Sequence, residues 1–213
     1  MRIRITFAKT EAMRFTSHLD LHRAWERAFR RAGLPLAYTQ GFSPHPRLNL
    51  ASALPLGFTG DQEIIDAWLE HELSIPEIQS TLSAALPPGL KISTIQPVDL
   101  RAPTLQTELY ASEFRITFLE PLPDLANRCA TLLYASQLPH QWRDKPYDLR
   151  PRILGLEMLP PDEDDRPRLL ARLSARQGAT GRPEEVIAAL GAVPEKARVH
   201  RTRLIFQPAQ APA

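Results

Sequence analysis

The 213-residue chain lacks several features that would point to particular protein classes. Its single cysteine, Cys129, excludes an intrachain disulfide and a cysteine-ligated metal cluster built by this chain alone. No apolar run approaches the roughly 18 residues of a membrane-spanning helix. The segment from Met1 to Arg4 enters a strand pattern without the apolar region of a signal peptide. We therefore expect a cytoplasmic protein that does not contact a membrane.

The charges are balanced over the whole chain but not along it. The net charge is +2, and 43% of the residues are hydrophobic, which suits a folded core rather than disorder. Residues 1–50 carry a net charge of +6, and residues 51–100 carry −6. A basic segment suits a polyanion or an acidic partner, whereas the acidic segment argues against complete wrapping by nucleic acid.

The hydrophobic periodicity predicts an α+β protein with antiparallel sheets, built as two tandem ferredoxin-like (β-α-β-β-α-β) units. Strands alternate between apolar and polar side chains, and helices repeat apolar residues at three to four positions. We predict domains at 1–100 and 101–213, with a linker from Leu100 to Thr107 and a disordered tail from Gln207 to Ala213. The expected strands are 2–7, 36–39, 47–53, 63–69, 90–95, 108–119, 153–159, 168–175 and 198–206, and the expected helices are 17–33, 75–86, 123–136 and 183–190.

In such a unit both helices cover one face of the sheet, so the other face is a candidate surface. Several strands alternate apolar residues with arginine, and such arginines suit phosphate because their planar fork makes paired hydrogen bonds. Exposed arginine is also the ordinary condition of a wet sheet face. The strands show no exposed aromatic residues, which argues against base stacking on the sheet. The arginines concerned are Arg2, Arg4, Arg115, Arg168, Arg172, Arg201 and Arg203.

A helix beginning near Ser17 carries four arginines on one face, opposite its apolar residues. They are Arg23, Arg27, Arg30 and Arg31, at positions i, i+4, i+7 and i+8. This stripe is either a polyanion-binding surface or a solvated face partly neutralised by neighbouring acids.

The loop from Gly41 to Arg47 follows this helix. Two prolines bracket His45, so the imidazole and Arg47 are presented on a stiff backbone. Gly41 permits a positive φ at the loop entrance. We favour a functional loop, because rigid loops with ionisable groups are where sites concentrate. The structural alternative is that Phe42 packs into the core.

Two histidines, His18 and His22, stand four residues apart on the same helix. This spacing can place two imidazoles on one metal, but no third ligand is evident beyond Asp20 or His45. We predict no metal and no cofactor.

The stretch from Arg14 to Gly57 also carries a resemblance. Its pieces are Arg14-Phe15, SHLDL from Ser17, ERAFRRAGLPLAYTQGF from Glu26, and a P-x-P-x-L then ALPLG run ending at Gly57. In these pieces the chain resembles the bacterial radical-SAM-linked domain of unknown function, found alone or C-terminal to a radical-SAM enzyme. The resemblance implies a radical-SAM protein as partner. The iron–sulfur cluster of such an enzyme needs several cysteines, which this chain lacks.

We expect a non-catalytic module that binds RNA or another anionic substrate and docks to a radical-SAM partner. The expected anion-binding residues are Arg2, Arg4, Arg14, Arg23, Arg27, Arg30, Arg31, His45 and Arg47.

Two alternatives remain. A metal-independent endoribonuclease could use His18, His45 and Tyr38. Tandem units of this kind are similar to the CRISPR repeat-processing endoribonucleases, although their C-terminal glycine-rich loop is missing here. A protein–protein scaffold could instead pair the +6 and −6 segments.

Overall fold

The computed structural model describes residues 1–142 and 145–207. The chain divides into two compact units, the first from Met1 to Glu108 and the second from Leu109 onward. The predicted α+β class with antiparallel strands is confirmed, with five α-helices in the described residues. The predicted disordered tail lies outside the described residues, except for Gln207. None of the described helices has the length and hydrophobicity needed to cross a bilayer.

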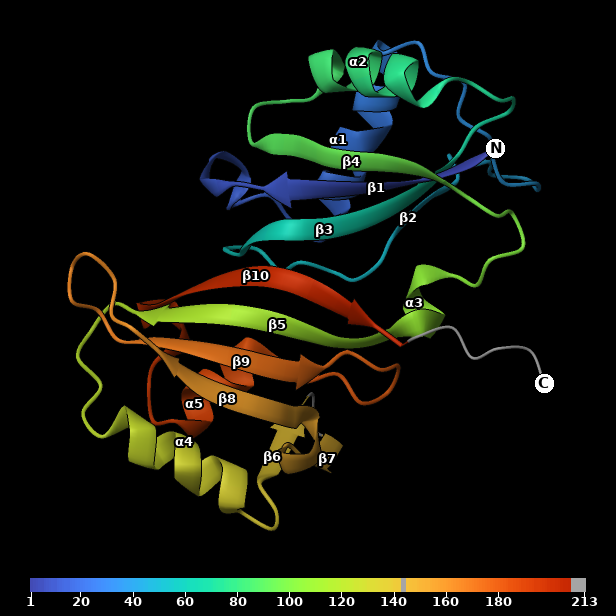
Figure 1. The fold of residues 1–213 in the computed structure, drawn as a ribbon. Helices are drawn as coiled ribbons and strands as arrows, with labels where there is room; N and C mark the ends of the chain where they lie inside the picture. The colour runs from blue at the N-terminus through green and yellow to red at the C-terminus, as the bar shows by residue number, and fades with distance from the viewer. Residues whose placement is uncertain (143–144, 208–213) are drawn as a thin grey trace. The chain divides into compact units, whose positions relative to one another are not determined.

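The first unit has its strands in the order β4-β1-β3-β2, and every neighbouring pair is antiparallel. In Figure 1, α1 passes behind β1 and β4. The elements are β1 (Arg2–Lys9), α1 (His18–Arg31), β2 (Leu48–Leu50), β3 (Thr59–Trp68), α2 (Ile75–Ala85), β4 (Leu90–Val98) and α3 (Leu105–Glu108).

The core of the first unit follows from the alternation in β1. Ile3, Ile5 and Phe7 are fully buried in one cluster with the apolar side chains of α1 and α2. The Trp25 ring meets the Phe7 ring edge-on, with 4.8 Å between centroids. Each such side chain contributes about 1.5–3 kcal/mol by leaving water. The opposite side of the sheet, carrying Arg2 and Arg4, is called its open face below.

The start of α1 is the one the sequence predicts. The Ser17 hydroxyl accepts a hydrogen bond from the Asp20 backbone N–H at 3.2 Å, which satisfies one of the unpaired donors of the first turn. The buried residues of α1 are Leu21, Trp25, Ala28 and Phe29, so its arginines point away from the core.

The second unit repeats this arrangement with the strand order β10-β5-β9-β8, again antiparallel. A separate two-stranded hairpin, β6–β7, follows α4, where the sequence analysis predicts no strand. The elements are β5 (Leu109–Phe118), α4 (Leu125–Tyr134), β6 (Pro139–Trp142), β7 (Lys145–Asp148), β8 (Ile153–Leu159), β9 (Arg168–Ser174), α5 (Pro183–Ala189) and β10 (Ala197–Phe206).

The segment expected to be a linker is instead part of the first unit. Leu105 is fully buried at the start of α3. Gln106 exchanges hydrogen bonds with the Asn49 amide at 2.8 and 2.5 Å and also donates to the Leu50 carbonyl at 2.6 Å. The segment contains a proline and several polar residues, which favoured a linker, but contacts with β2 hold it in the first unit.

The strand predicted at 36–39 is reduced to two isolated bridges, Leu36 with Leu69 and Tyr38 with Pro46. A second difference lies in β10, where the register shifts between Arg201 and Arg203. Arg201 lies beside Phe114 on the same side as Val199 and is buried, while the irregularity turns Arg203 to the other side, where it faces Glu113. Arg201 is therefore not on the open face, where we expected it.

Candidate nucleic-acid interface

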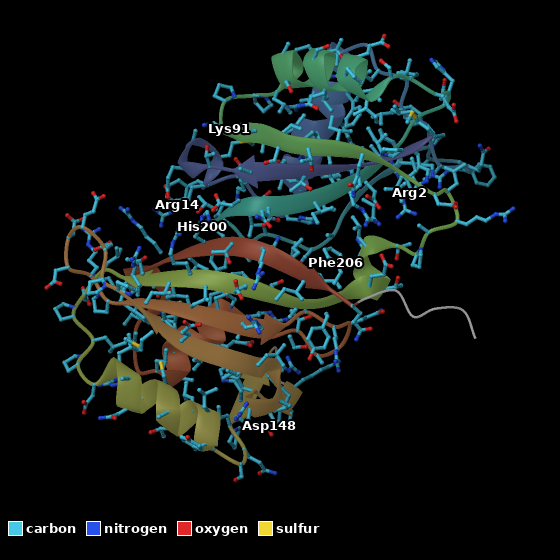
Figure 2. The ribbon with its side chains drawn as sticks, viewed as in Figure 1. Arg2, Arg14, Lys91, Asp148, His200 and Phe206 are labelled. Carbon is cyan, nitrogen blue, oxygen red and sulfur yellow. The ribbon has the colours of Figure 1, made fainter. Side chains whose placement is uncertain are left out.

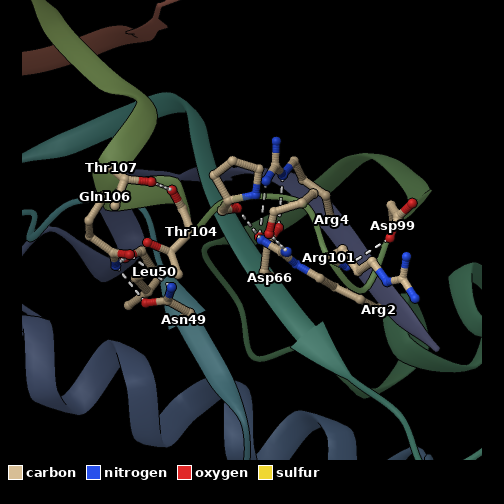
Figure 3. Close-up of polar contacts among 12 residues, drawn as sticks. Arg2, Arg4, Asn49, Leu50, Asp66, Asp99, Arg101, Thr104, Gln106 and Thr107 are labelled. Carbon is tan, nitrogen blue, oxygen red and sulfur yellow. Dashed lines mark hydrogen bonds and ion pairs between the residues drawn. The ribbon is translucent and has the colours of Figure 1, made fainter. Parts of the chain in front are cut away.

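Two of the candidate cations, Arg2 and Arg4, are held in an internal ion-pair network. Both guanidinium groups bind the Asp66 carboxylate, with closest contacts of 2.6 Å from Arg2 and 2.8 Å from Arg4. Arg2 also donates to the carbonyl oxygens of Ala102 and Pro103 at 2.6 and 2.9 Å (Figure 3). The Arg2 side chain is 1% exposed and that of Asp66 is 0% exposed. Arg2 is therefore too buried to bind an anion as we expected. The charge of Arg4 is largely neutralised by Asp66.

Arg14 lies at the opposite end of the first unit's sheet from Arg2 (Figure 2). Its Nε donates to the Gly57 carbonyl at 3.0 Å, and its Nη1 lies 3.8 Å from the Glu11 carboxylate. The guanidinium also stacks over the exposed Phe15 ring at 5.2 Å. These contacts fix the turn between β1 and α1, so the structure gives Arg14 a local packing role.

The stripe on α1 has three members that point outward: Arg23, Arg27 and Arg30, called the α1 stripe below. Arg23 pairs with Asp20 at 3.3 Å. The Ser17 hydroxyl, and then Arg23, hold the pKa of Asp20 below its usual value. In the described part of the chain, Arg27 and Arg30 make no hydrogen bond or ion pair through their side chains. They are therefore available cations.

The fourth arginine of the predicted stripe, Arg31, is directed toward α2. Its Nη1 donates to the Ala85 carbonyl at the end of that helix, at 2.9 Å. This contact ties the two helices together, so Arg31 has a structural contact that the other three lack.

Both ring nitrogen atoms of His22 have partners within the first unit. His22 Nδ1 lies 3.0 Å from the Glu26 carboxylate, and its Nε2 lies 3.3 Å from the Leu48 carbonyl. His22 thus connects α1 to β2, and Glu26 is engaged there. No group of three or more potential His, Cys, Asp or Glu metal ligands occurs among the described residues.

Residues 37–47 form a narrow hairpin-like segment, called the aromatic loop below. Its base is closed by three hydrogen bonds: Thr39 N–H to the His45 carbonyl (2.9 Å), Arg47 N–H to the Ala37 carbonyl (2.8 Å) and His45 N–H to the Thr39 hydroxyl (3.0 Å). Gly41 has φ of +129°, which meets the expectation of a positive φ at the entrance.

The rings of the aromatic loop stand in solvent. Phe42 is fully exposed and Tyr38 is 52% exposed. His45 and Arg47 are exposed on the same segment. The alternative in which Phe42 packs into the core is wrong. The loop thus exposes a ring at its tip, above a base closed by hydrogen bonds and beside His45 and Arg47, which composition alone did not reveal.

The structure joins only some of the candidate cations. Arg47 stacks on the Trp68 ring at 4.8 Å, and the buried Arg2 lies 4.9 Å from the same ring. Within the described residues, no hydrogen bond or ion pair links the α1 stripe to His45 or Arg47. The α1 stripe and the aromatic loop are two sets of exposed groups in the same unit.

The second unit contains a polar cluster that the sequence analysis missed. Glu185, 5% exposed, accepts a hydrogen bond from Arg182 at 2.9 Å and lies 4.0 Å from His140 Nε2. The Arg152 guanidinium stacks on the Tyr147 ring at 3.7 Å. Burial, and then the Glu185 carboxylate, raise the pKa of Tyr147 far above its ordinary value. Because these groups join the β6–β7 hairpin to α5 and are mostly enclosed, we assign them a fastening role.

Comparison with known proteins identifies a family. The family described as "uncharacterized protein conserved in bacteria (DUF2344)" matches residues 2–183, and the chain belongs to it. A comparison with curated proteins finds no match.

Solved structures with a similar chain include the archaeal box H/ACA sRNP Nop10–Cbf5 complex, at 11% identity and a TM-score of 0.46. They also include an H/ACA RNP bound to a substrate RNA containing 2′-deoxyuridine, at 12% identity and a TM-score of 0.46. In both, the match covers 95% of this chain and 47% of the other, so the chain spans about half the length of these neighbours.

Proposed function

We propose that this member of an uncharacterized bacterial family is a non-catalytic module that binds single-stranded RNA through the first unit. The aromatic loop carries the proposal, because it places two exposed rings beside the exposed Arg47 guanidinium and the His45 imidazole on a braced backbone. Proteins that bind single strands combine a cationic track for the phosphates with aromatic side chains for the bases. Stacking of one base on such a ring contributes about 1–3 kcal/mol.

The α1 stripe supplies the electrostatic part of the proposed site. Arg27 and Arg30 lie about one turn apart on the exposed side of α1, and neither side chain makes a hydrogen bond or ion pair in the described residues. Two unpaired guanidinium groups at this spacing can each neutralise a phosphate and release its counterion. Arg2, Arg4, Arg14 and Arg31 are not part of this site, because their contacts are internal.

The proposal includes an interpretation of the fold of each unit. We interpret each unit as ferredoxin-like, since the strand orders β4-β1-β3-β2 and β10-β5-β9-β8 both place the first and third strands of a unit at its centre. In the first unit, residues 102–108, which include α3, contact the open face through Arg2 and Asn49.

Salt-dependent binding of a labelled single-stranded RNA oligonucleotide is the decisive measurement. Arg27→Ala combined with Arg30→Ala is expected to weaken binding and to reduce the slope of log affinity against log salt by about 1.4, at about 0.7 per phosphate contact. Arg101→Ala, which removes an exposed arginine outside the site, is the matched control and should change neither quantity. Salt-independent binding, or an unchanged slope in the double variant, would contradict the proposal.

A cleavage assay with the same labelled RNA separates binding from catalysis. Tyr38 and His45, two residues of the ribonuclease alternative, both belong to the aromatic loop. Incubation of labelled RNA with the protein in a chelator should leave the RNA intact. Cleavage that disappears in His45→Ala would favour the endoribonuclease instead.

The partner part of the proposal is supported by the resemblance to radical-SAM-linked domains. We propose a cytoplasmic complex in which a separate radical-SAM protein supplies the chemistry and this chain holds the substrate. Affinity purification of the tagged protein from its native cells should enrich a radical-SAM protein. Failure to enrich one would contradict the proposed radical-SAM partner but not the proposed RNA binding.

A further inference from the structure

Each unit contains a carboxylate shared by two arginines on the open face of its sheet. In the first unit the carboxylate is Asp66, bound by Arg2 and Arg4. In the second it is Glu113 on β5, which lies opposite Arg172 of β9 and Arg203 of β10 in the strand register. The two arrangements have the same chemistry but different access to solvent.

The second arrangement holds its arginines firmly. Arg203 donates from Nε to Glu113 Oε1 at 3.0 Å and from Nη2 to Oε2 at 3.2 Å. Arg172 donates from Nε and Nη2 to Oε2 at 3.3 and 3.1 Å. Burial would raise the pKa of Glu113, but the bonds from Arg203 and Arg172 outweigh it and the pKa lies below its usual value. The carboxylate is therefore ionised at neutral pH and keeps both guanidinium groups in place.

The register irregularity in β10 brings Arg203 to the same carboxylate as Arg172. Without the shift between Arg201 and Arg203, both arginines would point to one face of the sheet. With it, Arg201 is buried beside Phe114, and Arg203 meets the carboxylate from the opposite side to Arg172.

Comparison with the first unit shows which guanidinium N–H donors of Arg172 and Arg203 remain available to a ligand. There, Arg2 uses its other nitrogen atoms on the carbonyl oxygens of Ala102 and Pro103, and the network is sealed. In the second unit the side chains of Arg172 and Arg203 are 49% and 50% exposed. Within the described residues, the Nη1 group of each has no hydrogen-bond acceptor. Two fixed guanidinium groups thus keep exposed donors beside a single carboxylate.

The surroundings on this face are also basic. The next two rows of the sheet place Arg115, Arg168 and Arg198 on the same side, with Glu157 as an acidic neighbour. Arg168 donates to the Pro160 carbonyl at 2.6 Å. The positive charges exceed the negative ones, so an oxyanion near Arg172 and Arg203 is favoured over a cation or an apolar group.

We propose that Arg172 and Arg203, positioned by Glu113, form a phosphate-binding site on the open face of the second unit. The ligand is a phosphate group, either the phosphodiester of a nucleic-acid strand or a free phosphate. The two guanidinium groups donate paired, charge-assisted hydrogen bonds to its oxygens. This site is separate from the proposed RNA site of the first unit and does not depend on it.

The test is NMR of the arginine Nε–H signals of the full chain, titrated at low salt with inorganic phosphate and, separately, with a single-stranded RNA oligonucleotide. The signals of Arg172 and Arg203, identified by their loss in Arg172→Gln and Arg203→Gln, should shift and saturate. Arg203→Gln should weaken binding at the Arg172 signal about tenfold. Lys145→Gln, which removes one exposed charge from the β6–β7 hairpin, is the matched control and should leave it unchanged.

The outcomes separate the two sources and the two proposals. Shifts with RNA at concentrations where phosphate gives none identify a nucleic-acid strand as the ligand, and comparable shifts with phosphate identify the free ion. The absence of shifts at Arg172 and Arg203 with both probes would overturn the site, as would equal binding by Arg203→Gln in a spectrum that shows a folded protein. Arg27→Ala should leave these signals unchanged, so a failure here would not count against the site in the first unit.

Discussion

Asp66→Asn tests the energetic difference between the two shared carboxylates. The substitution keeps the size of the side chain but removes the charge that Arg2 and Arg4 share. Because the Arg2 side chain is only 1% exposed, its guanidinium cannot recover water, and only neutral acceptors remain, namely the new amide oxygen and the carbonyl oxygens of Ala102 and Pro103. Removing one partner of a buried pair costs about 3–5 kcal/mol, and we expect a loss of unfolding free energy in this range.

The matched variant is Glu113→Gln in the second unit. Its two arginines are about half exposed, so water can replace part of the lost interaction, and we expect a loss of about 1–2 kcal/mol. Urea denaturation followed by circular dichroism gives both values. A loss below about 1 kcal/mol for Asp66→Asn, or equal losses for the two variants, would refute the reasoning.

Two further predictions concern the packing of each unit. Gly89→Ala should lower the unfolding free energy by about 1–3 kcal/mol, measured by the urea midpoint, because φ is +98° and an added Cβ would lie 2.7 Å from Met13 Cγ; an unchanged midpoint would contradict this account. Burial raises the pKa of Cys129 to about 11, so at pH 8 only about 0.1% of it is thiolate, and an aromatic disulfide reagent should react rapidly only after urea unfolds the chain. Rapid reaction of the native protein would show that the thiol is accessible.

The parts of the fold that were predictable from sequence are those set by local periodicity. Ile3, Ile5 and Phe7 alternate through β1 and are all buried, and Ser17 caps α1 as its position suggested. The same alternation placed Arg2 on the outer side correctly. What it could not show is that the carbonyl oxygens of Ala102 and Pro103, about 100 residues away, would cover that side chain.

The candidate site was predictable to a different degree in each of its parts. The outward direction of Arg23, Arg27 and Arg30 follows from helical spacing alone, because the helix geometry determines which side chains share a face. Helical spacing did not show that Arg31 binds the Ala85 carbonyl, since that contact requires the crossing of α2.

The aromatic loop was harder to predict from sequence. Its prolines and glycine determine how stiff the backbone is, but not whether the Phe42 ring points to the core or to solvent. Phe42 is aromatic, and the ordinary expectation for such a residue is burial. It is instead fully exposed, because the backbone hydrogen bonds between residues 37–39 and 45–47 close the segment below it and leave the tip without a surface to pack on.

Exposure of charge, rather than its number, distinguishes the surfaces of this chain. Residues 1–50 have a net charge of +6, yet Arg2 and Arg4 share one carboxylate and Arg14 and Arg31 donate to carbonyl oxygens. The last two contacts leave the charge of Arg14 and Arg31 in place, but they fix the direction of the side chain. The available cations are therefore those whose donors have no acceptor among residues 1–142 and 145–207. By that criterion Arg27 and Arg30 in the first unit and the Nη1 groups of Arg172 and Arg203 in the second are equivalent, although only the first two belong to a strongly basic segment of sequence.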